Sequence, residues 1–492
     1  MRRVCTAEQV RALDHAVIHG LGVPGAALME TASRGVALAI RRHHLDAARR
    51  GTVVVCGGGN NGGDGYAVAR WLHGWGIDTA IWSLSPRSSG DAAPMRAAAL
   101  ALGIPEVEGV EGAGLVVDAI FGTGLTRDVS GEPAGAIRAI TACGSPVVAV
   151  DLPSGLCSDT GAVRGVAVRA DRTVTFGYLK LGLLGEPGAD HAGVIDVVDI
   201  GLDAADPDAL LGPALAEVPD FADDLAGLWP VRGGGDHKGR SGHLAVVAGS
   251  RAMAGAAILA CRGALACGVG LLTLVTAAEA YPRLADLPPE VMVVVADDAT
   301  LQRLPEIREP TAWVVGPGLG GGEPLTAQAS ATLEEIWRTR TAPAVFDADA
   351  LACVGGAPGG PRVITPHPGE AGRLLGSSSG AVQADRFRAA RALARPGVVG
   401  LLKGRNTLIS TPDRPISVNP TGGPVLATGG SGDVLAGMIG ALLARGLGTW
   451  DATRVGAWLH GAAGDWLAER AGPHTATDIA AAVPAVLQAA RP

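Results

Sequence analysis

Residues 56–65 read Cys-Gly-Gly-Gly-Asn-Asn-Gly-Gly-Asp-Gly and lie between an apolar run, Thr52–Val55, and an amphipathic run, Tyr66–Leu72. This order predicts a strand, a glycine-rich loop and a helix. Glycines allow the backbone to approach a ligand closely and to turn its N–H groups toward it. The start of the helix adds the positive end of its dipole. The stretch therefore predicts an α/β unit that binds a phosphate-bearing ligand.

The glycine spacing of residues 57–62 also satisfies the dinucleotide fingerprint G-x-G-x-x-G. That fingerprint needs an acidic residue at the end of the second strand, where it holds a ribose. The second predicted strand, Asp78–Leu84, has its acid at the beginning and ends on Trp-Ser-Leu. A redox dehydrogenase is therefore disfavoured. The pair Asn60-Asn61 with Asp64 is the feature that the ordinary fingerprint does not contain.

Composition limits the class of protein. A chain of 492 residues that is 48% hydrophobic and holds 73 glycines predicts two or three domains with large cores. The net charge of −8 argues against nucleic acid as the main partner. The seven cysteines are dispersed without C-x-x-C spacing, which suits buried thiols in a reducing compartment. No signal peptide is expected, and the longest uncharged stretch, Gly263–Ala278, is too short to span a membrane. We expect a cytoplasmic protein.

Apolar strands alternate with helical patterns on both sides of a break between Leu202 and Gly235. The predicted strands are Thr52–Cys56, Thr79–Leu84, Leu115–Ile120, Pro146–Asp151, Arg172–Phe176, Val194–Val198, His243–Ala248, Leu271–Val275, Trp313–Gly316, Ala344–Asp347, Arg362–Thr365 and Val398–Lys403. The predicted helices are Ala7–His19, Pro24–His43, Tyr66–Gly74, Asp91–Leu102, Pro133–Ala142, Gly430–Ala444, Trp450–Arg470 and Ala476–Ala490. The alternation predicts two different α/β domains, residues 1–210 and 236–492. Residues 211–235 are predicted as a linker and the loop that leads into the second domain.

Three polar segments of the first domain lie at the carboxyl ends of predicted strands: Asn60–Gly65, Asp118 with Phe121–Asp128, and Asp151–Gly155. The carboxyl ends of parallel strands meet at one edge of a sheet, so these segments converge. Their amide, carboxylate and hydroxyl oxygens suit a hard cation, and a carboxylate there can act as acid or base. The alternative is that Asp118 and Asp151 only cap helices or turns.

These segments, in this order, resemble the NAD(P)HX epimerase family over roughly residues 4–205. Leu28–Ala32 also resembles it, although the family more often has Asn where Thr31 stands. The resemblance implies a Rossmann-like three-layer domain that interconverts the R and S epimers of the hydrated cofactors NADHX and NADPHX, with Asp151 as our hypothesis for the proton-handling group. It implies K⁺ at Asn61, Asp118 and Ser154. The implied hydrate-binding residues are Asn60, Asn61, Gly62, Gly63, Asp64, Gly122, Thr123, Gly124, Leu125, Thr126, Arg127, Asp128 and Asp151.

In the second domain, Ala427–Gly437 reads Ala-Thr-Gly-Gly-Ser-Gly-Asp-Val-Leu-Ala-Gly. A glycine cluster that opens a helix exposes N–H donors and forms a site for phosphate. Asp433 lies in the first helical turn, where a carboxylate can accept the proton of a hydroxyl that attacks a phosphoryl group. The alternative is a simple tight turn into a packed helix. No G-x-x-x-x-G-K-[ST] occurs, so the chain is not a P-loop enzyme.

This pattern resembles the ribokinase-like superfamily, and further segments resemble the ADP/ATP-dependent NAD(P)H-hydrate dehydratases over about residues 225–490, where Thr is usual at Ser431. Those segments are Asp236–His243, Gly249–Ser250, Gly255–Ala256, Gly316–Gly320, Asp347–Leu351, Thr365–Glu370 and Lys403–Thr407. The resemblance implies Mg²⁺ with ADP or ATP. The implied nucleotide contacts are Lys403, Gly404, Arg405, Asn406, Thr407 and Gly432. The implied hydrate contacts are Ala256, Gly318, Gly320, His367 and Asp433.

Together the two resemblances predict a bifunctional enzyme that repairs hydrated nicotinamide cofactors. Its expected partners are NADHX, NADPHX and ADP or ATP, with no nucleic acid and no membrane, and homo-oligomers are expected because they are common in both families. Two alternatives stay open. The second domain could be a small-molecule kinase that shares the glycine cluster and Asp433, and the first could be a non-catalytic dinucleotide-binding module.

Overall fold

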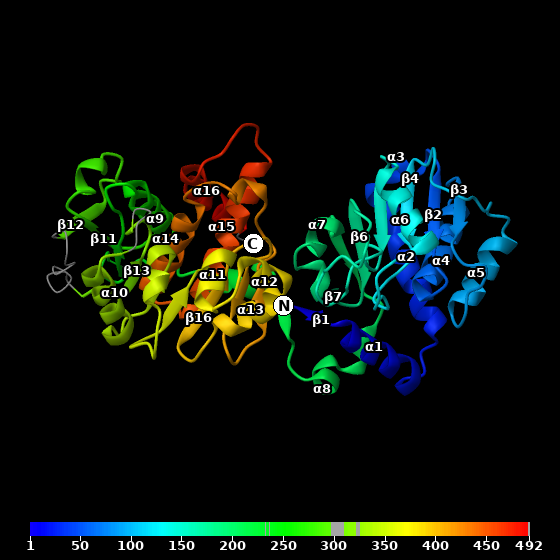
Figure 1. The fold of residues 1–492 in the computed structure, drawn as a ribbon, viewed down its shortest axis with the longest axis horizontal. Coiled ribbons are helices and arrows are strands. Elements are labelled where there is room, and N and C mark those ends of the chain that lie inside the picture. Colours follow the sequence, from blue (N-terminus) through cyan, green and yellow to red (C-terminus); the bar gives the residue numbers. More distant parts are fainter. Residues whose placement is uncertain (232, 236, 297–308, 321–324, 491–492) are drawn as a thin grey trace. The chain divides into compact units, whose positions relative to one another are not determined.

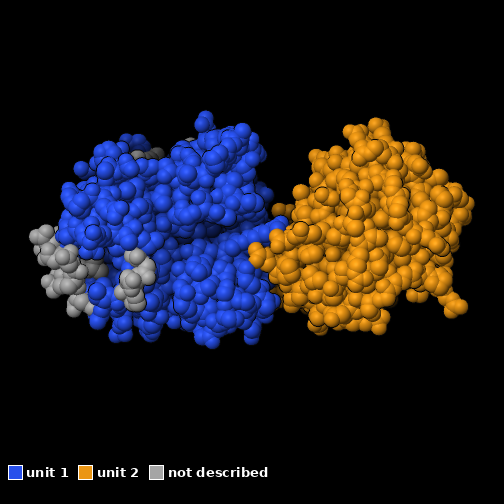
Figure 2. All heavy atoms as spheres, turned by 45° about the horizontal axis from the view of Figure 1, so that its top comes forward, with its two compact units in different colours: residues 1, 216–492 blue, residues 2–215 orange. Residues whose placement is uncertain are grey.

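The computed structural model describes residues 1–231, 233–235, 237–296, 309–320 and 325–490. The chain divides into two compact units (Figure 2). Residues 2–215 form the N-terminal unit, and residues 216–492 with Met1 form the C-terminal unit. Asp236, the first residue of one quoted segment, lies outside the described residues. Within the described ranges, no helix has both the length and the apolar character needed to cross a bilayer.

The N-terminal unit contains a six-stranded parallel sheet in the order β3-β2-β4-β5-β6-β8. Its strands are β2 (Thr52–Cys56), β3 (Thr79–Ser83), β4 (Leu115–Ala119), β5 (Val147–Val150), β6 (Arg172–Phe176) and β8 (Val194–Val198). All six were predicted, three of them with the same bounds. Buried parallel strands read as apolar runs, which is why the sequence pattern found them.

Helices cover both faces of this sheet (Figure 1). The helices are α1 (Ala7–His15), α2 (Gly25–His43), α3 (Leu45–Ala48), α4 (Asn60–Gly74), α5 (Ala92–Ala101), α6 (Gly131–Ala142), α7 (Gly188–Ala192) and α8 (Pro207–Leu211). Val54 and Cys56 pack with α2 and α4, whereas their neighbours Val53 and Val55 pack with α6. Alternation along a strand therefore builds the predicted three layers.

The glycine-rich stretch differs from the prediction in one respect. Helix α4 begins at Asn60 rather than Tyr66, so Asn60–Gly65 form its first turns and not a loop. The glycines serve close packing. A Cβ on Gly62 would lie 1.9 Å from the carbonyl oxygen of Gly57, and one on Gly65 would lie 2.5 Å from Cβ of Ala119. The first turns of α4 thus pack closely against the ends of β2 and β4.

A small strand pair lies outside the six-stranded sheet. β1 (Arg2–Cys5) runs parallel to β7 (Leu179–Lys180), with Cys5 opposite Lys180. Thr6 then caps α1 through a capping box. Neither strand was predicted, because runs of four and two residues carry no periodic signal.

The sheet of the C-terminal unit is parallel from β12 to β16 in the order β12-β11-β10-β13-β14-β15-β16, and β17, β18 and β9 extend it. Its strands are β9 (Ala216–Val218), β10 (His243–Val247), β11 (Leu271–Ala277), β12 (Val291–Ala296), β13 (Ala312–Val315), β14 (Ala344–Phe346), β15 (Arg362–Ile364), β16 (Val398–Leu402), β17 (Leu408–Ser410) and β18 (Ile416–Val418). β9 lies in the stretch predicted as a linker. It pairs with β18, and Phe221 and Leu225 enter the core, so the linker prediction is wrong from Ala216 onward.

Helices again cover both faces. They are α9 (Ala254–Ala266), α10 (Ala327–Thr339), α11 (Pro368–Leu374), α12 (Ser379–Ala384), α13 (Arg386–Leu393), α14 (Ser431–Ala444), α15 (Thr449–Ala468) and α16 (Ala476–Ala489). α9, α14, α15 and α16 pack together on one face. On the other face, Trp337 of α10 meets Phe346 edge-on, and Leu393 of α13 meets Gly400. The last three predicted helices are present within one or two residues of their predicted bounds.

Candidate active sites

Asp151 follows β5 and has an unusual backbone and an unusual partner. Its φ of 66° lies in the left-handed region, which is costly for a residue other than glycine and must be held by its surroundings. One oxygen, Oδ1, accepts hydrogen bonds from Lys180 Nζ at 2.7 Å and from Thr175 Oγ1 at 3.1 Å. The Lys180 side chain is only 1% exposed, so this is a buried ion pair. Asp151 is therefore fixed from one side.

The other oxygen of Asp151 faces Gly122. A Cβ at position 122 would lie 3.0 Å from Asp151 Oδ2 and 3.1 Å from Asn61 Oδ1. Nδ2 of Asn61 is buried and has no hydrogen-bond partner among the described residues. A buried polar group without a partner is costly, and a ligand atom beside Asn61 would relieve that cost. The structure thus brings the side chains of Asn61 and Asp151 together beside Gly122.

Asp118 and Ser154 form a second cluster at the same sheet edge. Asp118 accepts hydrogen bonds from the Ser154 backbone N–H at 2.7 Å and from its hydroxyl at 2.6 Å. Burial raises the pKa of Asp118 to about 6, although the Ser154 hydrogen bonds lower it. Ser154 Oγ also accepts from the Phe121 N–H at 2.8 Å. Since Phe121 precedes Gly122, the cluster adjoins the space beside Asn61.

Two further acids adjoin the Asp151–Lys180 pair. Burial raises the pKa of Asp64 well above its ordinary range, with the charge of Asp151 adding to this and a hydrogen bond from Ser33 opposing it. Burial also raises the pKa of Asp14, on α1, to about 6, against the attraction of Lys180. The surroundings of Asp151 are therefore rich in carboxyl groups that favour the neutral form.

The other predicted hydrate contacts divide by exposure. Gly62, Gly63 and Asp64 are buried in α4, and Gly122, Thr123 and Leu125 are half-buried after β4. The exposed ones are Asn60, Gly124, Thr126, Arg127 and Asp128. These exposed residues neighbour the cluster in sequence, and among the described residues no side-chain hydrogen bond joins them to it.

In the C-terminal unit, α14 starts behind Gly430, whose φ of 89° requires the freedom of glycine. Asp433 lies in the first turn, as predicted. Burial and then the charge of Asp347 raise the pKa of Asp433 to about 7, while Lys403 lowers it. At the same helix start, Ser431 Oγ lies 3.1 Å from the buried His460 Nε2. Asp433 is thus a carboxyl group whose ionisation falls near neutral pH.

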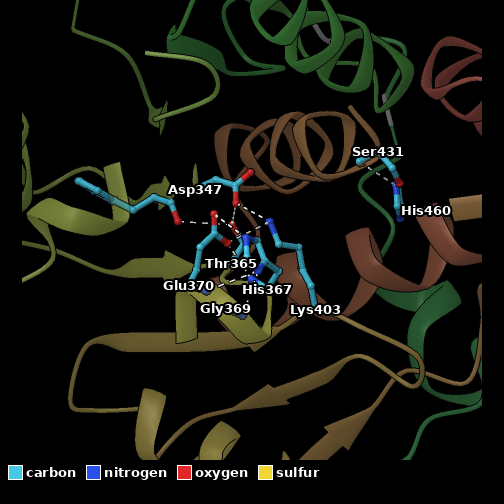
Figure 3. Close-up of polar contacts among 9 residues, drawn as sticks. Asp347, Thr365, His367, Gly369, Glu370, Lys403, Ser431 and His460 are labelled. Atoms are coloured by element: carbon cyan, nitrogen blue, oxygen red, sulfur yellow. Dashed lines mark hydrogen bonds and ion pairs between the residues drawn. The ribbon is translucent and has the colours of Figure 1, made fainter. Parts of the chain in front are cut away.

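Lys403 follows β16 and joins several acids (Figure 3). Its Nζ lies 2.9 Å from Asp347 Oδ1 and 3.8 Å from Glu370 Oε2, and Thr365 donates to the same Asp347 oxygen at 2.7 Å. Burial lowers the pKa of Lys403, but the attraction of Asp347 and Glu370 outweighs burial and raises it overall. A Cβ on Gly432 would lie 3.3 Å from this ammonium. A fixed cation therefore stands beside the N–H groups of the α14 start, as phosphate binding requires.

The remaining nucleotide candidates form a tight turn after β16. Gly404 and Asn406 have φ of 135° and 51°, and Thr407 Oγ1 donates to the carbonyl of Gly404 at 2.9 Å. The Arg386 guanidinium, nearly fully buried, donates to the carbonyls of Lys403 and Arg405. These contacts hold the turn in the shape that brings Lys403 to α14.

The hydrate candidates lie at neighbouring strand ends. Gly318 has φ of 65°, and a Cβ there would lie 2.9 Å from Cβ of Ala256. The N–H of Gly320 donates to Asp349 Oδ2 at 2.9 Å. His367 has a structural role as the N-cap of α11, because its Nδ1 accepts from Gly369 and Glu370. Its side chain is 53% exposed and so stays accessible to a ligand.

Sequence reasoning missed the partners of both acids. Lys180, Thr175 and Asp14 were not singled out, and Asp347 and Glu370 were quoted within motifs but given no role. The signal for Asp347 was its place at the carboxyl end of a predicted strand, as for Asp118 and Asp151. Lys180 gave no such signal, because it lies in the two-residue strand β7.

Comparisons with known proteins agree with this arrangement. A family model described as YjeF-related protein N-terminus matches residues 25–182, and one described as NAD(P)H-hydrate dehydratase matches residues 244–485. The chain is 37% identical over 474 residues to the bifunctional NAD(P)H-hydrate repair enzyme Nnr of Moorella thermoacetica, covering 89% of this chain and 87% of that one. It is 35% identical to the enzyme of the same name from Escherichia coli K12, covering 89% and 84%.

Among solved structures, the ADP/ATP-dependent NAD(P)H-hydrate dehydratase of Bacillus subtilis, co-crystallised with ATP and Mg²⁺, matches with a TM-score of 0.51 and 31% identity. It covers 56% of this chain and 99% of that chain. The resemblances predicted from the motifs are confirmed for both halves. The chain belongs to the family of bifunctional NAD(P)H-hydrate repair enzymes.

Proposed function

We propose that this chain repairs hydrated nicotinamide cofactors. The N-terminal unit interconverts the R and S epimers of NADHX and NADPHX. The C-terminal unit uses ADP or ATP to dehydrate the S epimer to NADH or NADPH, with AMP or ADP and phosphate as the other products. One observation carries the proposal: a single chain holds two carboxylates placed for acid–base chemistry, Asp151 facing Asn61 beside Gly122 and Asp433 at the start of α14.

Epimerisation inverts the ring carbon that bears the hydroxyl group, so a bond to that carbon must break and re-form. A base that takes the hydroxyl proton lets the oxygen become a carbonyl as the bond from this carbon to the ring nitrogen breaks. Closure of that bond on the other face, with return of the proton, gives the other epimer. Asp151 Oδ2 suits this task because its other oxygen is already held by Lys180. Asn61 Nδ2, buried without a partner among the described residues, would donate to the bound hydrate. The proposed hydrate site extends along Asn60–Asp64 and Gly122–Asp128.

Asn61, Asp118 and Ser154 would hold K⁺, which supplies a fixed positive charge beside the hydrate. Their side-chain oxygens are hard donors, and Asp118 and Ser154 are already in contact. That contact supports the donor set, because a buried carboxylate and a hydroxyl that share one site present several oxygens to a cation.

Dehydration requires a hydroxide to leave, and hydroxide is a poor leaving group. Asp433 would accept the proton of the hydrate's hydroxyl as that oxygen attacks a phosphoryl group: the new O–P bond forms and the bond to the rest of the nucleotide breaks. Phosphate then leaves, the neighbouring ring carbon loses a proton, and the dihydronicotinamide double bond re-forms. Lys403–Thr407 and Gly432 would hold the nucleotide, whose phosphates carry Mg²⁺, and Ala256, Gly318, Gly320 and His367 would hold the hydrate.

The relatives support repair over a small-molecule kinase, because their names give a hydrate repair activity and the matches cover most of both chains. The proposed site around Asp151 supports a catalytic N-terminal unit over a non-catalytic binding module. We further propose that residues 2–215 carry the epimerase and residues 216–492 the dehydratase, in line with the two compact units.

We also propose that the enzyme works in the cytoplasm as a homo-oligomer without nucleic acid. All seven cysteines are free thiols, which suits a reducing compartment, and the net charge of −8 disfavours nucleic acid. Light scattering on the purified chain tests the oligomeric state.

The proposal is tested by absorbance at 340 nm on a mixture of R and S NADPHX with Mg²⁺ and K⁺, first with ADP and then with ATP. Complete recovery of NADPH is expected, and the faster nucleotide names the donor. Recovery that stops at the S fraction would contradict the epimerase half. No recovery with either nucleotide, or a phosphorylated product in place of free phosphate, would contradict the dehydratase half.

A further inference from the structure

Lysine is scarce in this chain and its placement is informative. Of the 40 lysines and arginines, three are lysines, at positions 180, 238 and 403, and all the others are arginines. Lys180 and Lys403 lie beside the two proposed acid–base carboxylates. Lysine offers a compact ammonium that a guanidinium cannot replace in a confined site. A buried lysine in an arginine-rich chain therefore points to a specific task.

Every donor of the Lys180 ammonium is in use. Its Nζ donates to Asp151 Oδ1 at 2.7 Å, to Thr175 Oγ1 at 2.8 Å and to the carbonyl of Phe176 at 2.8 Å. Thr175 in turn donates to the same Asp151 oxygen at 3.1 Å. An ammonium has three hydrogens, so Lys180 has none left for a substrate. Its three hydrogen bonds go to Asp151, Thr175 and Phe176.

The backbone of Lys180 is also held. Lys180 lies opposite Cys5 in the parallel pair of β7 with β1. β1 precedes residues 25–182, which match the family model for the N-terminal half. Pairing with the first residues of the chain thus fixes the backbone of Lys180, and the Lys180 side chain in turn fixes Asp151.

We propose that Lys180 is a positioning residue of the epimerase site. It holds Asp151 by Oδ1 in the left-handed backbone conformation, so that Oδ2 is presented to the space shared with Asn61 over Gly122, and its charge favours the carboxylate that acts as base. This inference rests on the proposed epimerase function and adds to it a residue that acts through Asp151 without touching the substrate.

The groups around the pair make the charge of Lys180 important. Asp14 on α1 and Asp64 on α4 interact with both members of the pair, and Cys5 on β1 interacts with Lys180. All three are acids. Without the ammonium, the acidic groups on α1, α4 and β1 would oppose a negative charge on the base. Loss of Lys180 should therefore change the pH dependence of epimerisation.

The test is the pH–rate profile of epimerisation by the full chain carrying Lys180→Met, which keeps the length of the side chain and removes its charge. With NADPHX as substrate and an excess of a separate dehydratase as the coupling enzyme, kcat should fall about 100-fold, as for a displaced catalytic group, with KM within about threefold. The acid limb of the profile should move to higher pH. Lys180→Arg should keep the acid limb of the wild type and recover part of kcat.

Thr175→Val serves as a milder variant that keeps the lysine, and it should lower kcat about threefold without moving the acid limb. Thermal unfolding of each variant reports the fold. A wild-type profile in Lys180→Met would overturn the inference. So would a lower kcat with an unmoved acid limb, because a merely structural role gives that result. A wild-type chain that does not epimerise would instead contradict the proposed function itself.

Discussion

The two proposed catalytic aspartates face opposite electrostatic surroundings. Asp151 of the N-terminal unit is bonded directly to a buried lysine at 2.7 Å. Asp433 of the C-terminal unit has a lysine nearby, but Lys403 is bonded to Asp347, and burial together with Asp347 raises the pKa of Asp433 to about 7. One lysine stabilises the catalytic carboxylate itself, whereas the other neutralises a neighbouring carboxylate.

This difference matches the chemistry proposed for each unit. A base that takes and returns a proton without a cosubstrate is stabilised in its charged form by a permanent cation on the side away from the substrate. A base that works beside nucleotide phosphates would draw a directly paired lysine away from those phosphates. Lys403 instead pairs with Asp347 and Glu370, and its ammonium lies close to Gly432, where it can bind a phosphate. The two sites therefore differ in where the lysine charge lies, and not in the types of residue that they contain.

The largest effects are expected from removing each carboxylate in turn. Asp151→Asn should lower epimerisation about 1,000-fold and leave dehydration of pure S NADPHX unchanged, and Asp433→Asn should do the reverse, because a general base contributes on this scale. The 340 nm assay with pure epimers measures both. Loss of both activities in either variant would mean that the two sites do not act separately.

A smaller loss of epimerisation is expected when a side chain is added at Gly122. A Cβ in Gly122→Ala would lie 3.0 Å from Asp151 Oδ2 and 3.1 Å from Asn61 Oδ1, and so would occupy the proposed hydrate site. Epimerisation should fall about 100-fold, as for a misplaced substrate. Gly135→Ala on α6 is the matched control, since a Cβ there meets nothing within 4 Å and the residue lies outside the proposed hydrate site. Equal rates for the two variants would contradict the placement of the site.

The pH dependence of dehydration sharpens the contrast further. Asp433 must be ionised to accept a proton, and its pKa is raised to about 7. Dehydration of S NADPHX should therefore rise about tenfold from pH 5 to pH 6 and level off above pH 7. Initial rates at saturating nucleotide measure this. A rate that is already flat from pH 5 would show that Asp433 is not the titrating base.

The smallest effect concerns stability. Below about pH 3, Asp433 is protonated in both the folded and the unfolded chain. Between its ordinary value of 3.8 and about 7, the unfolded chain releases this proton and the folded chain keeps it, so stability falls as the pH rises. Asp433→Asn removes that loss. Its unfolding midpoint should exceed that of the wild type by about 2–4 °C at pH 8 and by less at pH 4; the same gain at both pH values would count against the raised pKa.

Much of this arrangement was predictable from local pattern. Buried parallel strands are apolar runs, and Asp118 and Asp151 were placed at their ends because the residue after such a run lies at the sheet edge. The helix start at Asn60 was not predictable, because glycines signal loops by propensity and only the contact of Gly62 with Gly57 shows the close packing.

The electrostatic partners were beyond prediction for a different reason. Asp151 and Lys180 are joined through β7, a strand of two residues whose pairing with β1 depends on the folded unit. Lys403 and Asp347 lie at the ends of β16 and β14, which are separated in the sheet by β15. Sequence gives the strand ends, whereas the order of strands decides which ends face each other.

The most direct test of the central claim is to mix Asp151→Asn and Asp433→Asn in equal amounts and follow NADPH recovery at 340 nm from R and S NADPHX with K⁺, Mg²⁺ and the nucleotide. Each variant alone should fall short: the first should stop at the S fraction and the second should recover almost nothing. The mixture should recover all of the NADPH, because each chain supplies the site that the other lacks. A mixture that still stops at the S fraction would contradict the claim that Asp151 and Asp433 serve two separate reactions.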